Sequence, residues 1–143
     1  MSSLHILVAE DNIDHAEMIL DALEEFNKEN KIEHFSNGDL IVSHLLNLQE
    51  LENGESSMPD LILMDIKMPI MDGLEALRLI KENPALKHIP IMMVSTSENS
   101  LDIEKSYRYG ANSYIVKPFD YTEFAKKICE VNHFWADISK LSK

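Results

Sequence analysis

Five polar residues that could act together in chemistry stand directly after short apolar segments of this sequence. Glu10 and Asp11 follow the first such segment, Asp65 follows a second, and Ser95 and Lys117 follow two more. Three carboxylates at close range repel one another unless a cation lies between them, and hard oxygen ligands suit Mg²⁺. A lysine adds a compact positive charge for phosphate oxygens. A carboxylate nucleophile, a dication, a hydroxyl and a lysine together predict a phosphoryl-transfer site.

The elements that must position these residues alternate along the chain. Aliphatic and β-branched residues predict five short strands, at residues 4–9, 31–35, 60–64, 89–94 and 113–116. Amphipathic patterns predict five helices, at residues 13–28, 40–51, 72–83, 98–109 and 121 to about 140. Strict alternation with continuous apolar strands predicts a parallel sheet covered by helices on both faces. Because ligands bind beyond the carboxyl ends of such strands, we expect the five polar residues to converge at one edge.

Local residue patterns mark where several of these helices begin and end. Asp72 and Glu75 are typical of a capping box, Pro84 ends the helix that follows them, and Gly110 fits a helix C-terminal cap. Apolar residues at helical spacing predict the core-facing side of the first helix: Ile13, Ala16, Leu20 and Leu23.

The composition indicates one globular domain over residues 1–143. A chain of 143 residues has the size of an ordinary domain, and an apolar content of 45% suffices for one core. No apolar stretch approaches the roughly 20 residues that a membrane helix needs, and the N-terminal residues do not match a signal peptide. Cys129 is the only cysteine, which excludes an internal disulfide and a multi-cysteine metal site. We expect a cytoplasmic location, and we expect Cys129 to be a small core residue.

The net charge of −12 lies entirely in the first part of the chain. Residues 1–60 hold 14 acidic residues and 2 lysines, whereas residues 61–143 hold 11 residues of each sign. Two interpretations stay open: a solvated face that aids solubility, or a surface that attracts a basic partner. The chain has no basic stripe to neutralise phosphates, so we expect no direct binding of nucleic acid.

Four motifs resemble the receiver domain of bacterial two-component response regulators: "ILVAEDN", "LILMDIKMPIMDG", "IPIMMVSTS" and "GANSYIVKPF". The resemblance runs from about His5 to at least Glu130, which is nearly the whole chain. It implies a flavodoxin-like (βα)5 doubly wound sheet with strand order 2-1-3-4-5. It also implies a single-domain response regulator that takes a phosphoryl group from a histidine kinase or a phosphotransfer protein. Such a domain catalyses its own phosphorylation and dephosphorylation, and we expect no separate enzymatic turnover.

The resemblance implies a role for each residue that matches the family motifs. Asp65 accepts the phosphoryl group. Asp11, Asp65 and the backbone carbonyl of Lys67 ligate Mg²⁺, while Glu10 acts on the metal through water. Lys117 pairs first with Asp65 and then with the phosphoryl group.

The resemblance also implies a conformational switch. Ser95 turns toward the new phosphoryl group, Tyr114 rotates inward, and the surface of helix four, strand five and helix five changes. Lys67 and Ser97 stand at positions that tune dephosphorylation. The bond between Lys117 and Pro118 is typically cis in the family, an isomer that proline makes accessible.

Single residues of this pattern have plainer interpretations. Asp11 could cap the first helix, Ser95 could be an ordinary turn residue, and Tyr114 could be a half-buried strand aromatic. The functional interpretation is favoured because all the polar residues follow the expected strands in the expected order.

Two other classes of function stay open. A phosphohydrolase of the haloacid dehalogenase type also forms an aspartyl phosphate, but it needs a second acid two residues after the nucleophile, where this chain has Lys67. The second alternative is a binding-only pseudo-receiver, and the presence of all the acids, the hydroxyl and the lysine argues against it.

We expect the output to be made by contact with an unidentified downstream protein, because the chain stops after its fifth predicted helix. The insert "NLQELENGESSMP" and the long last helix are similar to the small receivers paired with bacterial phytochrome kinases. Four apolar residues of the last helix either form a partner or homodimer surface or fold back on the core: Phe134, Trp135, Ile138 and Leu141.

Overall fold

The computed structural model describes residues 3–51 and 57–138, which form a parallel sheet flanked by helices. The strands are β1 (His5–Ala9), β2 (Lys31–Phe35), β3 (Leu61–Met64), β4 (Ile91–Ser95) and β5 (Ser113–Val116). The helices are α1 (Ile13–Phe26), α2 (Gly38–Glu50), α3 (Gly73–Glu82), α4 (Ser100–Arg108) and α5 (Tyr121–His133), and α5 continues into a π-helical segment, η2 (Phe134–Ile138). The strand order β2-β1-β3-β4-β5 confirms the order that the resemblance implies.

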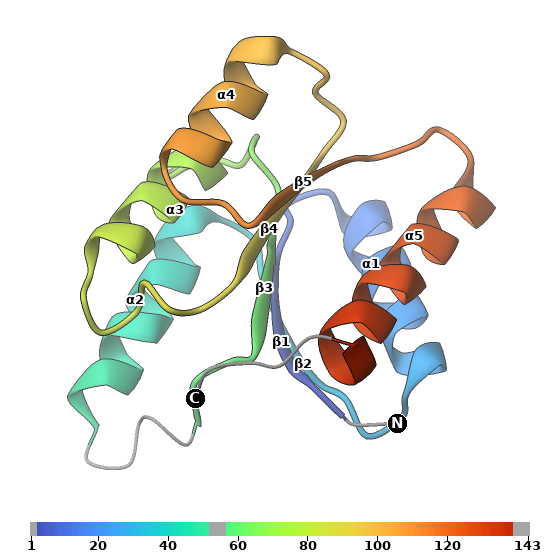
Figure 1. The fold of residues 1–143 in the computed structure, drawn as a ribbon, viewed down its shortest axis with the longest axis horizontal. Coiled ribbons are helices and arrows are strands. Elements are labelled where there is room, and N and C mark those ends of the chain that lie inside the picture. Colours follow the sequence, from blue (N-terminus) through green and yellow to red (C-terminus); the bar gives the residue numbers. More distant parts are fainter. Residues whose placement is uncertain (1–2, 52–56, 139–143) are drawn as a thin grey trace.

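Helices cover both faces of the sheet (Figure 1). α1 and α5 lie side by side on one face, and α2, α3 and α4 lie on the other. One apolar cluster fills the space under α2 and α3, and a second fills the space under α1 and α5. The doubly wound α/β architecture is therefore confirmed.

The burial of each strand follows its place in the sheet. Every residue of the inner strands β3 and β4 is buried, whereas the edge strand β2 is partly exposed. The register pairs Ala9 with Met64 and Ser95 with Val116, the last residues of their strands. The residues that follow these strands therefore leave the sheet at the same edge.

Each helix that follows a strand begins at an Asn or Asp whose side chain accepts a hydrogen bond from a backbone N–H of the first turn. These N-cap residues are Asn12, Asn37, Asp72, Asn99 and Asp120. Because Asn12 caps α1, the plainer interpretation of Asp11 as the cap is wrong. Asp72 caps α3 as predicted, but the Glu75 carboxylate of the expected capping box accepts a hydrogen bond from Arg78 Nε.

The predicted core-facing side of the first helix needs a correction. Ile13 is 71% exposed, and the buried residues of α1 are Ala16, Met18, Ile19, Ala22 and Leu23. The physical reason is that α1 begins beyond the carboxyl edge of the sheet, so its first residue has no strand to pack on. The C-terminal end of α4 is as predicted: Gly110 has a φ of 104° just after this helix, a conformation that favours glycine.

The chain after α5 settles part of the open question about its aromatic residues. Trp135 packs against the core, and its Nε1 donates to Met92 Sδ at 3.0 Å, whereas Phe134 is 45% exposed. Cys129 is partly buried against the same cluster. Leu141, the side chain of Ile138, and residues 52–56 and 139–140 of the predicted insert and helix lie outside what the structure describes.

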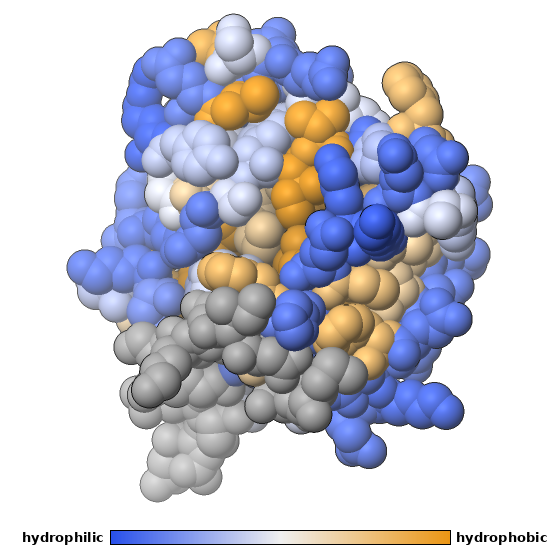
Figure 2. Space-filling model, turned by 45° about the vertical axis from the view of Figure 1, so that its right-hand side comes forward, coloured by the Kyte–Doolittle hydropathy of each residue, from blue (hydrophilic) through white to orange (hydrophobic). Residues whose placement is uncertain are grey.

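A groove of about 740 Å³ runs beside β5. Figure 2 shows apolar side chains gathered on the middle of this face and hydrophilic ones around them. The apolar lining of the groove comes from Met92, Ile115, Val116, Val131, Phe134 and Trp135. Among residues 3–51 and 57–138, no helix is both long enough and apolar enough to cross a membrane.

Candidate functional site

The predicted site residues leave neighbouring strands at the carboxyl edge of the sheet. The acidic pair follows β1, Asp65 follows β3 and Lys117 follows β5. Asp65 N donates to Ala9 O at 3.0 Å, and Lys117 N donates to Ser95 O at 2.7 Å. Backbone pairing thus continues into the site and holds Asp65 and Lys117 in fixed places relative to the neighbouring strands.

Glu10, Asp11 and Asp65 form an acidic cluster, with one carboxylate oxygen of each within 4.8 Å of those of the other two. Glu10 is only 1% exposed. Its burial, and then the negative charge of Asp65, raise the pKa of Glu10 to about 7, against the lowering effect of Lys117. A dication between the carboxylates would relieve this repulsion, and three hard oxygen donors suit it chemically. The acidic cluster therefore fits a divalent metal ion.

The Lys117 ammonium is buried among three acceptors. Its Nζ donates to Glu10 Oε1, to Asp65 Oδ2 at 3.2 Å and to His15 Nδ1 at 3.1 Å. The Lys117 side chain is 2% exposed and that of Asp65 is 12% exposed. A buried cation in contact with two carboxylates offsets part of their repulsion.

The loop after β3 is held against α3 by a close backbone approach. Asp65 Oδ1 accepts a hydrogen bond from Ile66 N at 2.7 Å, and Gly73 N donates to Ile66 O at 2.7 Å. A Cβ at Gly73 would lie 1.8 Å from the Asp65 carbonyl oxygen. Between these points the chain turns tightly: Ile70 has a φ of 69°, an uncommon conformation for a β-branched residue. The Lys67 side chain is exposed on this loop.

The segment after β4 connects the site to α4 and β5. Ser95 is buried, and its Oγ accepts from Ser97 N at 3.1 Å. Ser97 Oγ donates to Asp102 Oδ2 on α4 at 2.7 Å. Tyr114 on β5 donates from its hydroxyl to Ser97 O at 2.9 Å, and its ring packs partly buried against the core. Tyr114 is therefore half-buried, as the plainer interpretation holds, and it is also bonded to the segment that follows Ser95.

Sequence reasoning missed three residues of this site. His15 contacts Lys117, His34 Nε2 lies 2.7 Å from the backbone carbonyl oxygen of Glu10, and Gly73 permits the close approach to Asp65. The "MDG" at the end of the second motif could have drawn attention to Gly73. A histidine in the first turn of a helix or on an edge strand has no comparable motif, because its contact is made across the fold.

One expectation about the site is wrong in this structure. None of the peptide bonds in the described ranges is cis, so the bond between Lys117 and Pro118 is trans. The trans isomer is the more stable form of an X–Pro bond by about 0.5–1 kcal/mol unless its surroundings select the other.

Comparison with known proteins places the chain in a family. The sequence model of the family described as "response regulator receiver domain" matches residues 6–129. The probable methanogenesis regulatory protein FilR2 of Methanothrix harundinacea is 32% identical over 91% of this chain and 82% of its own length. Response regulator Rcp1 of Synechocystis is 31% identical over 92% of this chain and 88% of its own length.

Solved structures agree with this assignment. The phosphorylated cyanobacterial phytochrome response regulator RcpA is 32% identical, with a TM-score of 0.88 over 99% of this chain and 100% of RcpA. The Mn²⁺-bound form of Rcp1 is 30% identical, with a TM-score of 0.85 over 98% of this chain and 99% of Rcp1. The chain belongs to the response regulator receiver domain family, the signalling domains of two-component systems. Rcp1 binds Mn²⁺, and the acidic cluster of this chain fits a divalent metal ion of that kind.

Proposed function

We propose that Asp65 accepts a phosphoryl group from a histidine kinase or a phosphotransfer protein in a reaction that needs Mg²⁺. The observation that carries this proposal is the acidic cluster with Lys117 Nζ at hydrogen-bond distance from Asp65. A partly exposed carboxylate that faces both a cation site and a lysine suits in-line phosphoryl transfer.

The chain's own residues would divide the chemistry as follows. An Asp65 carboxylate oxygen forms the new P–O bond, the P–N bond to the donor histidine breaks, and the imidazole nitrogen keeps that electron pair. Lys117 offsets the negative charge that develops on the phosphoryl oxygens. Asp11, Asp65 and the Lys67 carbonyl would hold Mg²⁺ directly, and Glu10 would hold it through water. The bound dication supplies charge neutralisation between the carboxylates and the phosphoryl oxygens.

We further propose that phosphorylation is read out through the surface of α4, β5 and α5. Support comes from the hydrogen bonds of Ser97. Its backbone N–H donates to the Ser95 hydroxyl, its own hydroxyl donates to Asp102 on α4, and its backbone carbonyl accepts from Tyr114 on β5. If Ser95 turns toward the phosphoryl group, its bond with Ser97 N must change, and that change passes to both elements. The groove beside β5 lies on this surface and would change shape with it. Lys67 and Ser97 would set the lifetime of the phosphoryl group.

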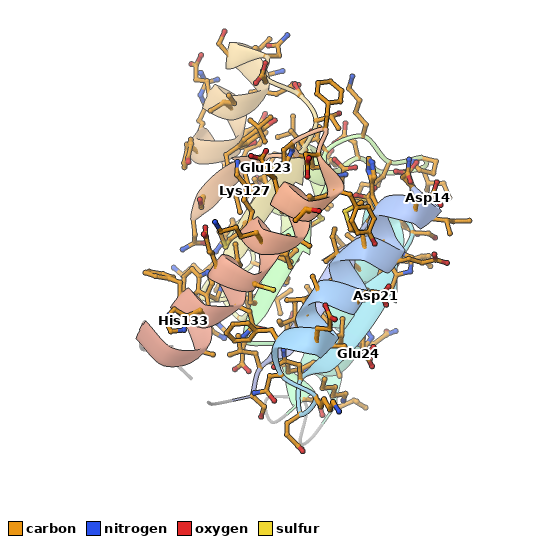
Figure 3. The ribbon with its side chains drawn as sticks, turned by 90° about the vertical axis from the view of Figure 1, so that its right-hand side faces the viewer. Asp14, Asp21, Glu24, Glu123, Lys127 and His133 are labelled. Carbon is orange, nitrogen blue, oxygen red and sulfur yellow. The ribbon has the colours of Figure 1, made fainter. Side chains whose placement is uncertain are left out.

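The donor and the downstream target are proteins in this proposal. α1 presents a row of acidic side chains, of which Asp14, Asp21 and Glu24 are labelled in Figure 3. α5, which carries Glu123 and Lys127, packs alongside α1. This row supports the interpretation of a surface for a basic partner. The similarity to the phytochrome response regulator RcpA supports a phytochrome-type kinase as the donor. A homodimer formed through the apolar residues at the end of the last helix stays a prediction, as does the cytoplasmic location.

Labelling by a small acyl phosphate tests the phosphoacceptor directly. The wild type should gain one phosphoryl group in Mg²⁺ and none after chelation, and Asp65→Asn should gain none. Asp72→Asn is the matched control, because it changes a carboxylate on the same loop and asparagine caps a helix equally well; it should label like the wild type. An unlabelled wild type, or a labelled Asp65→Asn, would refute the proposal. Rapid turnover of small phosphate esters would instead favour a phosphohydrolase.

A further inference from the structure

The contact between His15 and Lys117 lies in the site but is used by none of the roles described above. Lys117 Nζ lies 3.1 Å from His15 Nδ1. An ammonium has three N–H donors and no acceptor, so this contact is favourable only when Nδ1 carries a lone pair. The geometry therefore defines the tautomer of His15: Nδ1 accepts, and the proton sits on Nε2.

The His15 ring is held in place from two sides. The His15 backbone N–H donates to the Asn12 side chain, which caps α1. The ring meets Phe124 of α5 edge-on, with centroids 6.2 Å apart and planes at 84°, and Phe124 is 1% exposed. Such an edge-to-face contact with a buried ring restricts the imidazole. His15 is thus a fixed acceptor, although its side chain is 31% exposed.

The three acceptors around Lys117 differ in one respect. Glu10 and Asp65 belong to the acidic cluster that we propose to hold a metal ion, so their oxygens are shared between the lysine and that ion. His15 is the lysine contact outside that cluster. It can hold the ammonium beside Asp65 whether or not the carboxylates are engaged elsewhere.

We propose that His15 is a positioning residue for Lys117: its Nδ1 accepts the third hydrogen bond of the ammonium and keeps that charge beside Asp65 during phosphoryl transfer. This role rests on the proposed phosphorylation of Asp65. It acts through the lysine, and His15 makes no bond to the phosphoryl group.

Two variants separate the acceptor from the ring. His15→Phe keeps an aromatic ring against Phe124 and removes the acceptor. His15→Asn places a carbonyl oxygen where Nδ1 stood and removes the ring. Because one hydrogen bond to a charged group is lost at a partly exposed position, we expect His15→Phe to label roughly fivefold more slowly at saturating Mg²⁺. His15→Asn should stay within about twofold of the wild type, and the Mg²⁺ concentration for half-maximal rate should not change in either variant.

Nitrogen-15 NMR of the His15 ring supplies a readout that does not depend on activity. At neutral pH, and in the absence of any phosphoryl donor, the His15 ring of the wild type should be the tautomer that is protonated at Nε2. A protonated Nδ1, a wild-type rate in His15→Phe, or an equal loss of rate in both variants would overturn the positioning role. An unlabelled wild type would overturn the phosphoacceptor proposal and this role together, whereas a labelled wild type with an equally fast His15→Phe would overturn this role alone.

Discussion

Gly73→Ala offers a sharp test of how the fold positions Asp65. Gly73 is the first residue of α3, and its backbone lies against the loop that carries Asp65. The added Cβ would stand 1.8 Å from the Asp65 carbonyl oxygen and 2.8 Å from its carbonyl carbon. Both neighbours are backbone atoms, so they cannot rotate away as a flexible side chain would.

The size of the effect follows from these distances. A Cβ is essentially never found closer than 3.0 Å to such an atom, so α3 or the Asp65 backbone must move by at least 1.2 Å. Overpacking of this kind costs about 1–3 kcal/mol of unfolding free energy. A displacement of about 1 Å in a reacting group can cost about 100-fold in rate. We therefore expect a folded but less stable protein that accepts phosphoryl groups on the order of 100-fold more slowly.

Gly110→Ala is the matched control for this experiment. Gly110 has a φ of 104°, and its nearest outside neighbour is the flexible side chain of Lys81. An alanine there is strained by roughly 1–3 kcal/mol, a cost similar to that at Gly73. Because Gly110 follows α4 and does not touch the Asp65 loop, the labelling rate should stay close to that of the wild type.

The assay combines urea unfolding with the initial rate of labelling from a small acyl phosphate. The labelling rates of both variants are measured without urea, under buffer conditions in which the urea titrations show that each variant is folded. Labelling of Gly73→Ala at the wild-type rate would contradict this prediction. An equal loss of rate in Gly110→Ala would contradict it too, because the loss would then follow stability and not the position of Asp65.

Three further predictions concern the end of α5, the β1–β2 surface and the acidic cluster. Trp135→Ala should lower the unfolding free energy by about 2–3 kcal/mol, and Phe134→Ala by less than about 1, because the first ring packs on the core and the second is largely exposed; urea titration measures both. Burial acts to raise the pKa of Glu33, but the hydrogen bond from His5 and the nearby histidine charges hold that pKa below the ordinary value of a glutamate. A lowered folded-state pKa stabilises the fold above about pH 4.5, so Glu33→Gln should lose its destabilising effect as the pH falls below that value. Asp11→Asn removes one of three carboxylates and should weaken Mg²⁺ or Mn²⁺ binding by about tenfold or more in calorimetry.

Each of these predictions has a contradicting result. Equal losses of stability for the two aromatic variants would mean that the end of α5 packs differently. A Glu33→Gln effect that grows on acidification would reverse the sign of the linkage. Unchanged metal affinity in Asp11→Asn would place the ion outside the acidic cluster.

The sequence by itself determined the order of the elements and the edge at which the site forms. Hydrophobic periodicity is local, so the strands around Leu63 and Val94 could be recognised as buried without knowledge of their neighbours. Alternation of strands and helices then restricts the topology, and the topology brings the residues after each strand to one edge. For that reason Glu10, Asp65 and Lys117 could be predicted together from chain position and residue type.

Contacts across the fold were decided only by the tertiary structure. His15 and Lys117 are 102 residues apart, and no periodic pattern relates a histidine on α1 to a lysine after β5. The outward position of Ile13 and the different surroundings of Phe134 and Trp135 have the same cause. Helical spacing says which residues share a face, but only packing against the sheet and α5 decides which of them is covered. The sequence could name the groups that we propose for the chemistry, while the folded chain decided what holds them in position.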